Sequence, residues 1–339
     1  MQNKKVLITG ITGFLGSHTA IAFLKKGYAV VGTIRNFSRK EAIKKTIVEH
    51  TNNGNMLSFV EIDLASPQAD WDKALTNIDY VVHIASPFPT TLPKSDDELI
   101  IPAKQGTLNV LNAATKAGVK RVVITSSSGA AVYGNKKVGI FTEKDWTNIA
   151  NLKDTTAYFR SKTIAEKAAW DFVKQIPNAP ELVSILPGAI LGPVLEKDFG
   201  TSANIVKKLL DGSMPAMPKI GYEMVDVRSV AQAFINAIEI EEAKGERFLC
   251  TNGYLTFSDI AKILKDKYPT KKIPSGTLPN FMVRFFSNID KETKPILNDL
   301  ETSRKVDNSK IKKLLKWQPI ELEKAVVDTA ESLLKQGII

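Results

Sequence analysis

Six short apolar runs rich in β-branched residues alternate with longer segments of helical period in the first half of this 339-residue chain. The runs are nearly continuous in apolar character, which is typical of strands that are buried on both faces of a sheet. We predict strands at 6–9, 29–34, 57–62, 80–84, 122–125 and 182–186, and helices at about 14–26, 39–50, 95–117 and 156–175. This alternation predicts an α/β fold with a doubly wound parallel sheet of the Rossmann type.

The texture of the sequence changes after Pro187, where glycine and proline residues follow one another closely. Further helices are expected near 201–211, 226–243, 256–268 and 320–336. We therefore divide the chain into residues 1–187, a Rossmann domain, and residues 188–339, mainly a smaller, loop-rich C-terminal region at the open edge of the sheet. Some segments of the second part are expected to return to the Rossmann core.

Composition and charge exclude several classes of protein. No stretch approaches the roughly 18 uninterrupted apolar residues of a membrane span, and the run from Val6 to Ile8 is too short for a signal peptide. A single cysteine, Cys250, excludes a disulfide framework within the chain, and with three histidines no metal site is expected. The single cysteine fits a reducing compartment, so we expect a cytoplasmic protein. The basic residues behind the net charge of +10 are scattered as pairs, so we expect no nucleic-acid partner.

A glycine-rich turn with G-x-x-G-x-x-G spacing joins the first predicted strand to the first predicted helix. Glycine lets the backbone approach a pyrophosphate, and a helix N-terminus offers free N–H groups to it. This strand–turn–helix context is that of a dinucleotide fingerprint, and it disfavours the alternative of a tight turn with no ligand. We expect cofactor contacts from Thr9, Gly10, Thr12, Gly13, Phe14, Leu15 and Gly16.

The end of the second predicted strand indicates which dinucleotide the chain binds. An NAD-selective site usually has an acidic residue here, which bonds the ribose 2′-OH, whereas an arginine suits a 2′-phosphate. This chain has Arg35, followed by Arg39 and Lys40 in the same loop. Because arginine contacts phosphate with two prongs and lysine adds charge, we favour NADP(H) over NAD. The alternative is a solvated basic loop.

Three other strand ends point at the same crevice, because ligands of such sheets bind outside the carboxyl ends of the strands. Asp63 and Leu64 follow the third strand and are candidates for an adenine contact. The segment Ile84–Ser86 closes the fourth strand and is a candidate for passing under the ribose and pyrophosphate. Each could instead be the start of a loop. Thr125, which ends the fifth strand, is a further candidate cofactor contact.

A set of residues suited to carbonyl chemistry follows. Thr125 leads into a serine cluster at 126–128, and Tyr158 and Lys162 lie four residues apart in a predicted helix, hence on one face. A nearby ammonium favours the phenolate, so we expect Lys162 to lower the pKa of Tyr158 and make proton transfer feasible. A serine hydroxyl would orient and polarise a carbonyl. Each motif alone is common, but their order after the glycine turn is specific.

The chain resembles the extended short-chain dehydrogenases/reductases, and within them the dihydroflavonol reductase, cinnamoyl-CoA reductase and aldehyde/ketone reductase group. The strings that carry the resemblance span roughly residues 4 to 265. They are Val6–Gly10 with its glycine turn, Val82–Pro87, Pro102–Leu111, Tyr158–Trp170, Leu186–Pro193 and Val225–Arg228.

The resemblance implies a catalytic set of Ser127, Tyr158 and Lys162, with Lys162 also holding the nicotinamide ribose. It implies that Pro187 and Gly188 lie against the nicotinamide. Ser126 and Ser128 stay open as alternatives to Ser127. The expected activity is NADPH-dependent reduction of an aldehyde or ketone to the alcohol, with tyrosine as the proton donor.

The sequence leaves two alternative functions. One is an NAD-dependent epimerase or dehydratase acting on a nucleotide-linked sugar, and the other is a nonenzymatic NADP-sensing protein. Arg35 and the lack of an acidic pair after Ser128 argue against the first, and the Tyr158/Lys162 pair argues against the second. We expect a monomer or homodimer.

The substrate is expected to be a small carbonyl compound of apolar or aromatic character. Phe88 is a candidate substrate contact, beside Ser127 and Tyr158. The other residues expected to line the pocket are methionines and aromatic residues, which adapt to varied apolar shapes, or else simply fill the core: Phe199, Met214, Met217, Tyr222 and Met224.

Overall fold

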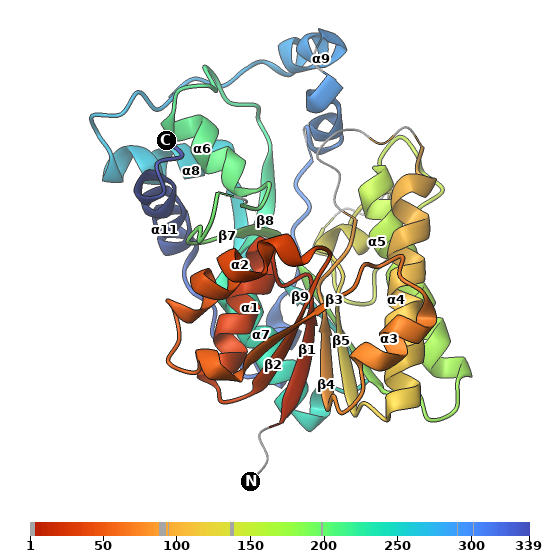
Figure 1. Cartoon of the computed structure of the whole chain (residues 1–339). Helices are drawn as coiled ribbons and strands as arrows, with labels where there is room; N and C mark the ends of the chain where they lie inside the picture. The colour runs from red at the N-terminus through yellow and green to blue at the C-terminus, as the bar shows by residue number, and fades with distance from the viewer. Residues whose placement is uncertain are drawn as a thin grey trace.

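The computed structural model describes residues 4–87, 93, 95–135, 139–197, 199–289, 291–300 and 302–339. Seven strands, all parallel to their neighbours, form the main sheet in the order β3-β2-β1-β4-β5-β6-β9 (Figure 1). They are β1 Lys5–Thr9, β2 Ala29–Ile34, β3 Leu57–Glu61, β4 Tyr80–His83, β5 Arg121–Thr125, β6 Glu181–Pro187 and β9 Arg247–Cys250. The order reverses beside β1, so the predicted doubly wound Rossmann fold is confirmed.

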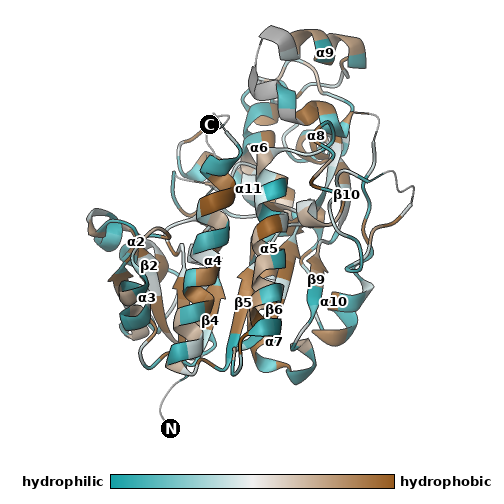
Figure 2. Ribbon diagram, turned by 90° about the vertical axis from the view of Figure 1, so that its right-hand side faces the viewer, coloured by the Kyte–Doolittle hydropathy of each residue, from teal (hydrophilic) through white to brown (hydrophobic). Residues whose placement is uncertain are grey.

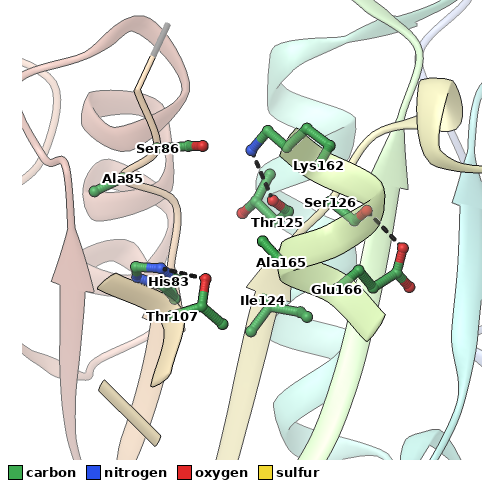
Figure 3. Close-up of a pocket in the computed structure, with 10 residues that line it drawn as sticks. All are labelled: His83, Ala85, Ser86, Thr107, Ile124, Thr125, Ser126, Lys162, Ala165 and Glu166. Atoms are coloured by element: carbon green, nitrogen blue, oxygen red, sulfur yellow. Dashed lines mark hydrogen bonds between the residues drawn. The ribbon is translucent and has the colours of Figure 1, made fainter. Parts of the chain in front are cut away.

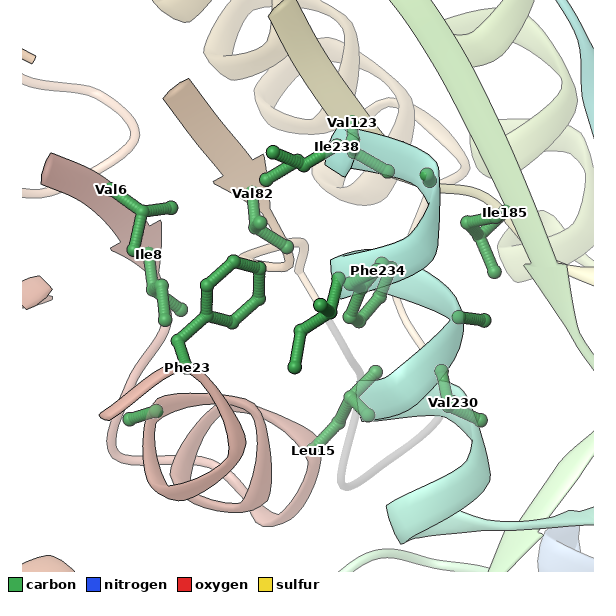
Figure 4. Close-up of a cluster of buried hydrophobic side chains, with 14 of the residues drawn as sticks. Val6, Ile8, Leu15, Phe23, Val82, Val123, Ile185, Val230, Phe234 and Ile238 are labelled. Atoms are coloured by element: carbon green, nitrogen blue, oxygen red, sulfur yellow. The ribbon is translucent and has the colours of Figure 1, made fainter. Parts of the chain in front are cut away.

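Helices cover both faces of this sheet (Figure 1). One face carries α1 Phe14–Lys25, α2 Lys40–Val48 and α7 Val227–Glu239, and the other carries α3 Gln68–Ala74, α4 Asp97–Ala117 and α5 Ala157–Gln175. Alternate residues of a strand point to opposite faces. Val6 and Ile8 therefore join Phe23 and Phe234 under α1 and α7 (Figure 4), whereas Leu7 packs into the cluster on the other face.

The second part of the chain builds a smaller sheet and its own apolar core. The sheet has the order β10-β8-β7, with β7 Ala189–Leu191, β8 Gly221–Asp226 and β10 Gly253–Thr256. Around it pack α6 Ala203–Leu210, α8 Phe257–Lys267 and α11 Leu322–Lys335, with α9 Asn280–Ile289 beyond them (Figure 2). Helix α10, Ser309–Leu314, lies against β9 of the main sheet. Short 3-10 segments are Phe37–Arg39, Gly54–Met56, Ser128–Ala130, Glu241–Ala243 and Lys291–Asp299.

Two elements that follow Pro187 belong to the main sheet and its cover. Strand β9 pairs with β6, and α7 packs on α1. Helix α7 starts where the Asp226 carboxylate accepts a hydrogen bond of 2.8 Å from the Arg228 N–H, the N-cap expected for an aspartate at this place. The crossover through the smaller sheet therefore returns the chain to the edge of the Rossmann core.

A buried arginine ties the end of α7 to the sheet. Arg121 on β5 is fully buried, and its Nη1 donates to the Ala237 and Ile240 carbonyls at 2.8 and 2.6 Å. Its Nε donates to Glu181 Oε2 at 2.7 Å. The cation therefore satisfies helix carbonyls that have no partner within the helix.

Candidate nucleotide-binding and active site

The glycine turn is shaped so that side chains would not fit in it. Gly10 has φ of +70°, and a Cβ on it would lie 3.1 Å from the Ala85 Cα. A Cβ on Gly16 would lie 2.1 Å from the Gly10 carbonyl oxygen, so α1 and the turn touch. No side chain of the described residues caps α1 at Gly13, and the first turn of α1 carries no acidic residue. The first N–H groups of α1 are therefore available to an anionic ligand.

Thr9 locks the end of β4 beside this turn. Its Oγ1 accepts the N–H groups of Ile84 and Ala85, both at 2.9 Å, so its own proton is donated to His83 Nδ1 at 2.9 Å. His83 then carries its proton on Nε2, and burial lowers its pKa to about 3. His83 is a neutral structural residue, and the Ile84–Ser86 segment is held against the crevice.

The three basic residues after β2 differ in their surroundings. Arg35 is exposed and forms no ion pair within the described part of the chain. The Arg39 guanidinium donates to Glu196 Oε2 at 2.7 Å, and the Lys40 ammonium lies 5.4 Å from the Phe37 ring centroid. Arg35 is thus the cation most open to a phosphate, and Arg39 already shares its charge with a carboxylate.

The residues after β3 form a turn at the same edge of the sheet. Asp63 Oδ1 accepts a hydrogen bond of 2.9 Å from the Ala65 N–H, and Ser66 Oγ accepts one of 3.0 Å from the Asp63 N–H. Leu64 lies against Gly106 of α4, where a Cβ would come within 2.8 Å of its side chain. The turn is well ordered by its own contacts, and its role in binding adenine stays a prediction.

The three residues expected to be catalytic come together. Thr156 caps α5 by accepting a hydrogen bond of 3.3 Å from the Phe159 N–H, which places Tyr158 and Lys162 on successive turns. The Ser127 side chain interacts with Tyr158 and favours its ionised form. Lys162 Nζ donates to the Thr125 carbonyl at 3.1 Å and lies 6.0 Å from the Tyr158 ring centroid.

The geometry separates the three serines that follow Thr125. Ser127 Oγ accepts a hydrogen bond of 3.1 Å from the Gly129 N–H, which leaves the hydroxyl proton free to be donated elsewhere. Ser126 Oγ points the other way and donates to Glu166 Oε2 at 2.6 Å. Ser128 opens a short 3-10 segment. Of the three serines, Ser127 is the one whose side chain influences Tyr158.

The expected lowering of the Tyr158 pKa is wrong for this structure. Burial raises the pKa of Tyr158 to about 12, and the Ser127 hydroxyl opposes that rise. Burial also lowers the pKa of Lys162 to about 8, partly offset by the negative charge of Glu166. The ammonium is directed at a carbonyl rather than at the phenol oxygen, so desolvation decides the pKa of the tyrosine. At neutral pH the phenol carries its proton.

Below Lys162 lies a small polar cavity (Figure 3). Its volume is about 20 Å³, which is enough for one water molecule. The lining comes from β4, α4, β5 and α5: His83, Ala85, Ser86, Thr107, Ile124, Thr125, Ser126, Lys162, Ala165 and Glu166. The Thr125 hydroxyl, which is buried, has no hydrogen-bond partner among the described residues. A water here would satisfy it beside Lys162.

The predicted nicotinamide contacts lie at the end of β6. A Cβ on Gly188 would lie 2.2 Å from the Glu223 carbonyl oxygen, so only glycine lets β6 run this close to β8. Pro187 ends β6 directly before it. Phe88 lies outside the described residues.

Of the apolar residues expected to line the pocket, Met217 and Met224 are buried in the core of the smaller region. Phe199, Met214 and Tyr222 are partly buried and pack against that same core. A stacked aromatic pair does lie beside Tyr158: the Tyr133 and Phe159 ring centroids are 3.9 Å apart, and Phe159 also contacts the Tyr158 ring.

Sequence reasoning missed a buried ionic network behind the serine cluster. Glu166 on α5 and Arg247 on β9 are 1% and 8% exposed and pair at 2.7 Å. The only signal in the sequence was that Glu166 lies four residues after Lys162, on the apolar face of an amphipathic helix.

A parallel Rossmann sheet with a glycine turn, an open helix N-terminus and a Ser127/Tyr158/Lys162 cluster defines a protein of the short-chain dehydrogenase/reductase class. Among the described residues, no cluster of side chains could hold a metal ion, and no helix is long and apolar enough to cross a membrane.

Comparison with known proteins supports the assignment to this class. The sequence profile of the NAD dependent epimerase/dehydratase family matches residues 6–250, and the chain belongs to this family. An uncharacterized oxidoreductase of Schizosaccharomyces pombe is 35% identical over 291 residues, covering 80% of this chain and 84% of the relative. Cinnamoyl-CoA reductase CAD2 of Medicago truncatula is 31% identical, covering 97% and 95%. The structure of yeast methylglyoxal/isovaleraldehyde reductase Gre2 complexed with NADPH is similar, with a TM-score of 0.81, 28% identity and coverage of 99% and 100%. The resemblance to extended short-chain reductases is confirmed.

Proposed function

We propose that this protein reduces an aldehyde or ketone to the alcohol with NADPH. The observation that carries the proposal is the meeting of Ser127, Tyr158 and Lys162 at the carboxyl ends of the strands, beside the glycine turn. Its relatives include a cinnamoyl-CoA reductase and an aldehyde reductase solved with NADPH. Reduction of a carbonyl is the chemistry common to both names.

The nucleotide site fits NADP(H). The turn at Gly10 and Gly16 has no room for side chains, which suits the close approach of a pyrophosphate to the backbone. The uncapped N-terminus of α1 suits its negative charge. Exposed Arg35 suits a 2′-phosphate, because a guanidinium binds phosphate with two parallel hydrogen bonds. The proposed contacts of the remaining parts of the cofactor, its adenine, ribose and nicotinamide, are Asp63, Leu64, Ser86 and Gly188.

In the proposed reaction, three side chains have distinct roles. Bound NADPH supplies the hydride. Ser127 donates its hydroxyl hydrogen bond to the carbonyl oxygen, while the Gly129 N–H occupies one lone pair of its oxygen. Tyr158 gives its proton to the same oxygen as negative charge develops. Lys162, held by the Thr125 carbonyl, supplies positive charge and a donor for the nicotinamide ribose.

The raised pKa of Tyr158 suits the direction of reduction. A phenol with a pKa of about 12 is fully protonated at neutral pH, so the proton donor is ready before substrate arrives. Transfer to an alkoxide, whose conjugate acid is about as weak as water, is still downhill. Oxidation of the alcohol would need the phenolate, which burial disfavours.

The proposed substrate is an apolar or aromatic carbonyl compound. The stacked rings of Tyr133 and Phe159 adjoin Tyr158 and would favour an apolar group next to the reacting carbon.

The test is the loss of absorbance at 340 nm when NADPH or NADH is mixed with aromatic aldehydes, diketones, α-keto esters and a dihydroflavonol. We expect turnover with NADPH in preference to NADH, and loss of turnover in Tyr158→Phe. Retained, tightly bound NAD with no turnover of free cofactor would contradict the proposal and favour a sugar-nucleotide epimerase.

A further inference from the structure

We propose that Glu166 is a positioning residue: held by Arg247, it anchors Ser126 and thereby sets the position of Ser127 relative to Tyr158. The inference rests on the proposed function and adds residues that do not touch the substrate. Its basis is a chain of buried contacts that runs from β9 to the serine cluster.

The first link is the attachment of Glu166 to Ser126. Ser126 is 5% exposed and Glu166 is 1% exposed, and the hydrogen bond between them is 2.6 Å long. The Ser126 N–H donates to the Ile185 carbonyl of β6 at 2.8 Å. Ser126 is therefore fixed by its backbone to the sheet and by its side chain to α5 (Figure 3). Ser127 directly follows this doubly fixed residue, so its position depends on both bonds.

The second link holds the carboxylate itself. Arg247 Nε donates to Glu166 Oε1 at 2.7 Å and its Nη2 donates to Oε2 at 3.2 Å, a two-pronged contact. Trp170 Nε1 adds a bond of 3.3 Å to Oε1. These partners fix the orientation of the Glu166 carboxylate, with Oε2 directed at Ser126.

The third link fixes the arginine. Its Nη1 donates to the carbonyls of Glu143 and Asp145 at 2.6 and 3.0 Å, and its guanidinium carbon lies 3.6 Å from the Trp146 ring centroid. Arg247 thus ties β9 and the 143–146 loop to α5. Rigid support of this kind is what a reacting group needs, because small displacements cost rate.

A general structural role would explain a buried ion pair equally well, so the test must separate the two. The key variant is Ser126→Ala, which removes one hydroxyl and leaves the Glu166–Arg247 pair intact. Ser229→Ala is the matched control. Ser229 lies on α7, is 3% exposed, and its hydroxyl oxygen accepts a hydrogen bond of 2.8 Å from the Ile320 N–H. Both variants should lose a similar amount of thermal stability.

We expect kcat to fall about tenfold in Ser126→Ala, in line with the sensitivity of rate to small misplacements. KM and the NADPH dissociation constant should change less than twofold, and Ser229→Ala should keep wild-type kcat. In a double-mutant cycle, Glu166→Gln should add little to the effect of Ser126→Ala, because both act through one bond. A kcat within twofold of wild type in Ser126→Ala would overturn the inference. This result decides the question even if the Glu166→Gln protein does not fold.

Crystal structures of the wild type and Ser126→Ala give a readout that needs no turnover. We expect the Ser127 Oγ to move relative to the Tyr158 hydroxyl in the variant. An unchanged distance between these two oxygens would overturn the inference. Absence of carbonyl reduction by the wild type would instead count against the proposed function, while the two crystal structures still decide the role of Glu166.

Discussion

Replacing Lys162 by methionine should make the protein more stable at pH 7 and inactive. The ammonium is 7% exposed, and burial lowers its pKa from 10.5 to about 8. At about 1.36 kcal/mol per pKa unit, burying this charge destabilises the fold by about 3 kcal/mol at pH 7. Methionine removes that penalty but leaves the Thr125 carbonyl without its partner, which costs about 1 kcal/mol. The expected net gain is about 2 kcal/mol.

The pH dependence of this gain fixes its cause. Because the pKa is lower in the folded state, the unfolded chain binds more protons between pH 8 and 10.5, so the wild type loses its disadvantage as pH rises. Thermal unfolding without NADPH should show Lys162→Met about 4 °C above the wild type at pH 7 and near it at pH 10. Lys174→Met, exposed on the same helix, is the control and should change little. The reasoning would be refuted if Lys162→Met were less stable than the wild type at pH 7. It would also be refuted if the gain in melting temperature were as large at pH 10 as at pH 7.

Three further variants test the nucleotide site and the sheet. Arg35→Ser should weaken NADPH binding at least tenfold and leave NADH binding nearly unchanged, as measured by titration of nicotinamide fluorescence; equal losses for both would contradict the 2′-phosphate assignment. Gly16→Ala should abolish binding of both cofactors, because its Cβ would meet the Gly10 carbonyl at 2.1 Å, whereas Gly276→Ala, in open space, should bind normally. Arg121→Ala should lower the free energy of unfolding in urea by about 3 kcal/mol, because Glu181 and the end of α7 lose their partner; exposed Lys120→Ala should change it by under about 0.5 kcal/mol, and a similar effect of both variants would argue against the buried network.

The Rossmann half could be predicted from local pattern because its strands are buried on both faces. Runs such as Val6–Thr9 and Ala29–Ile34 are nearly continuous in apolar character, and each is followed by a helical segment. The short strands β7 and β10 carry no such signal: Ala189–Leu191 has three residues, and Gly253–Thr256 is half-buried throughout. Their pairing depends on contacts between distant segments, so periodicity could not reveal them.

The candidate site divides in the same way. Ser127, Tyr158 and Lys162 were found because their spacing carries chemistry, whereas Arg247 is 81 residues from its partner Glu166 and has no motif. The pKa of Tyr158 was mispredicted because a sequence gives the neighbouring lysine but not the depth of burial. Met217 and Met224 were expected to line the pocket but are buried in the core. Residue type could not decide between the two, because methionine adapts to a core as readily as to a pocket.

The most direct test of the account is the fate of the hydride. The protein is incubated with an aldehyde that it turns over and with NADPH deuterated at the transferred position of C4, and the alcohol is analysed by mass spectrometry. The account predicts one deuterium on the carbinol carbon with the wild type, and no alcohol with Tyr158→Phe, which still binds NADPH. An alcohol without deuterium, or undiminished turnover in Tyr158→Phe, would contradict it.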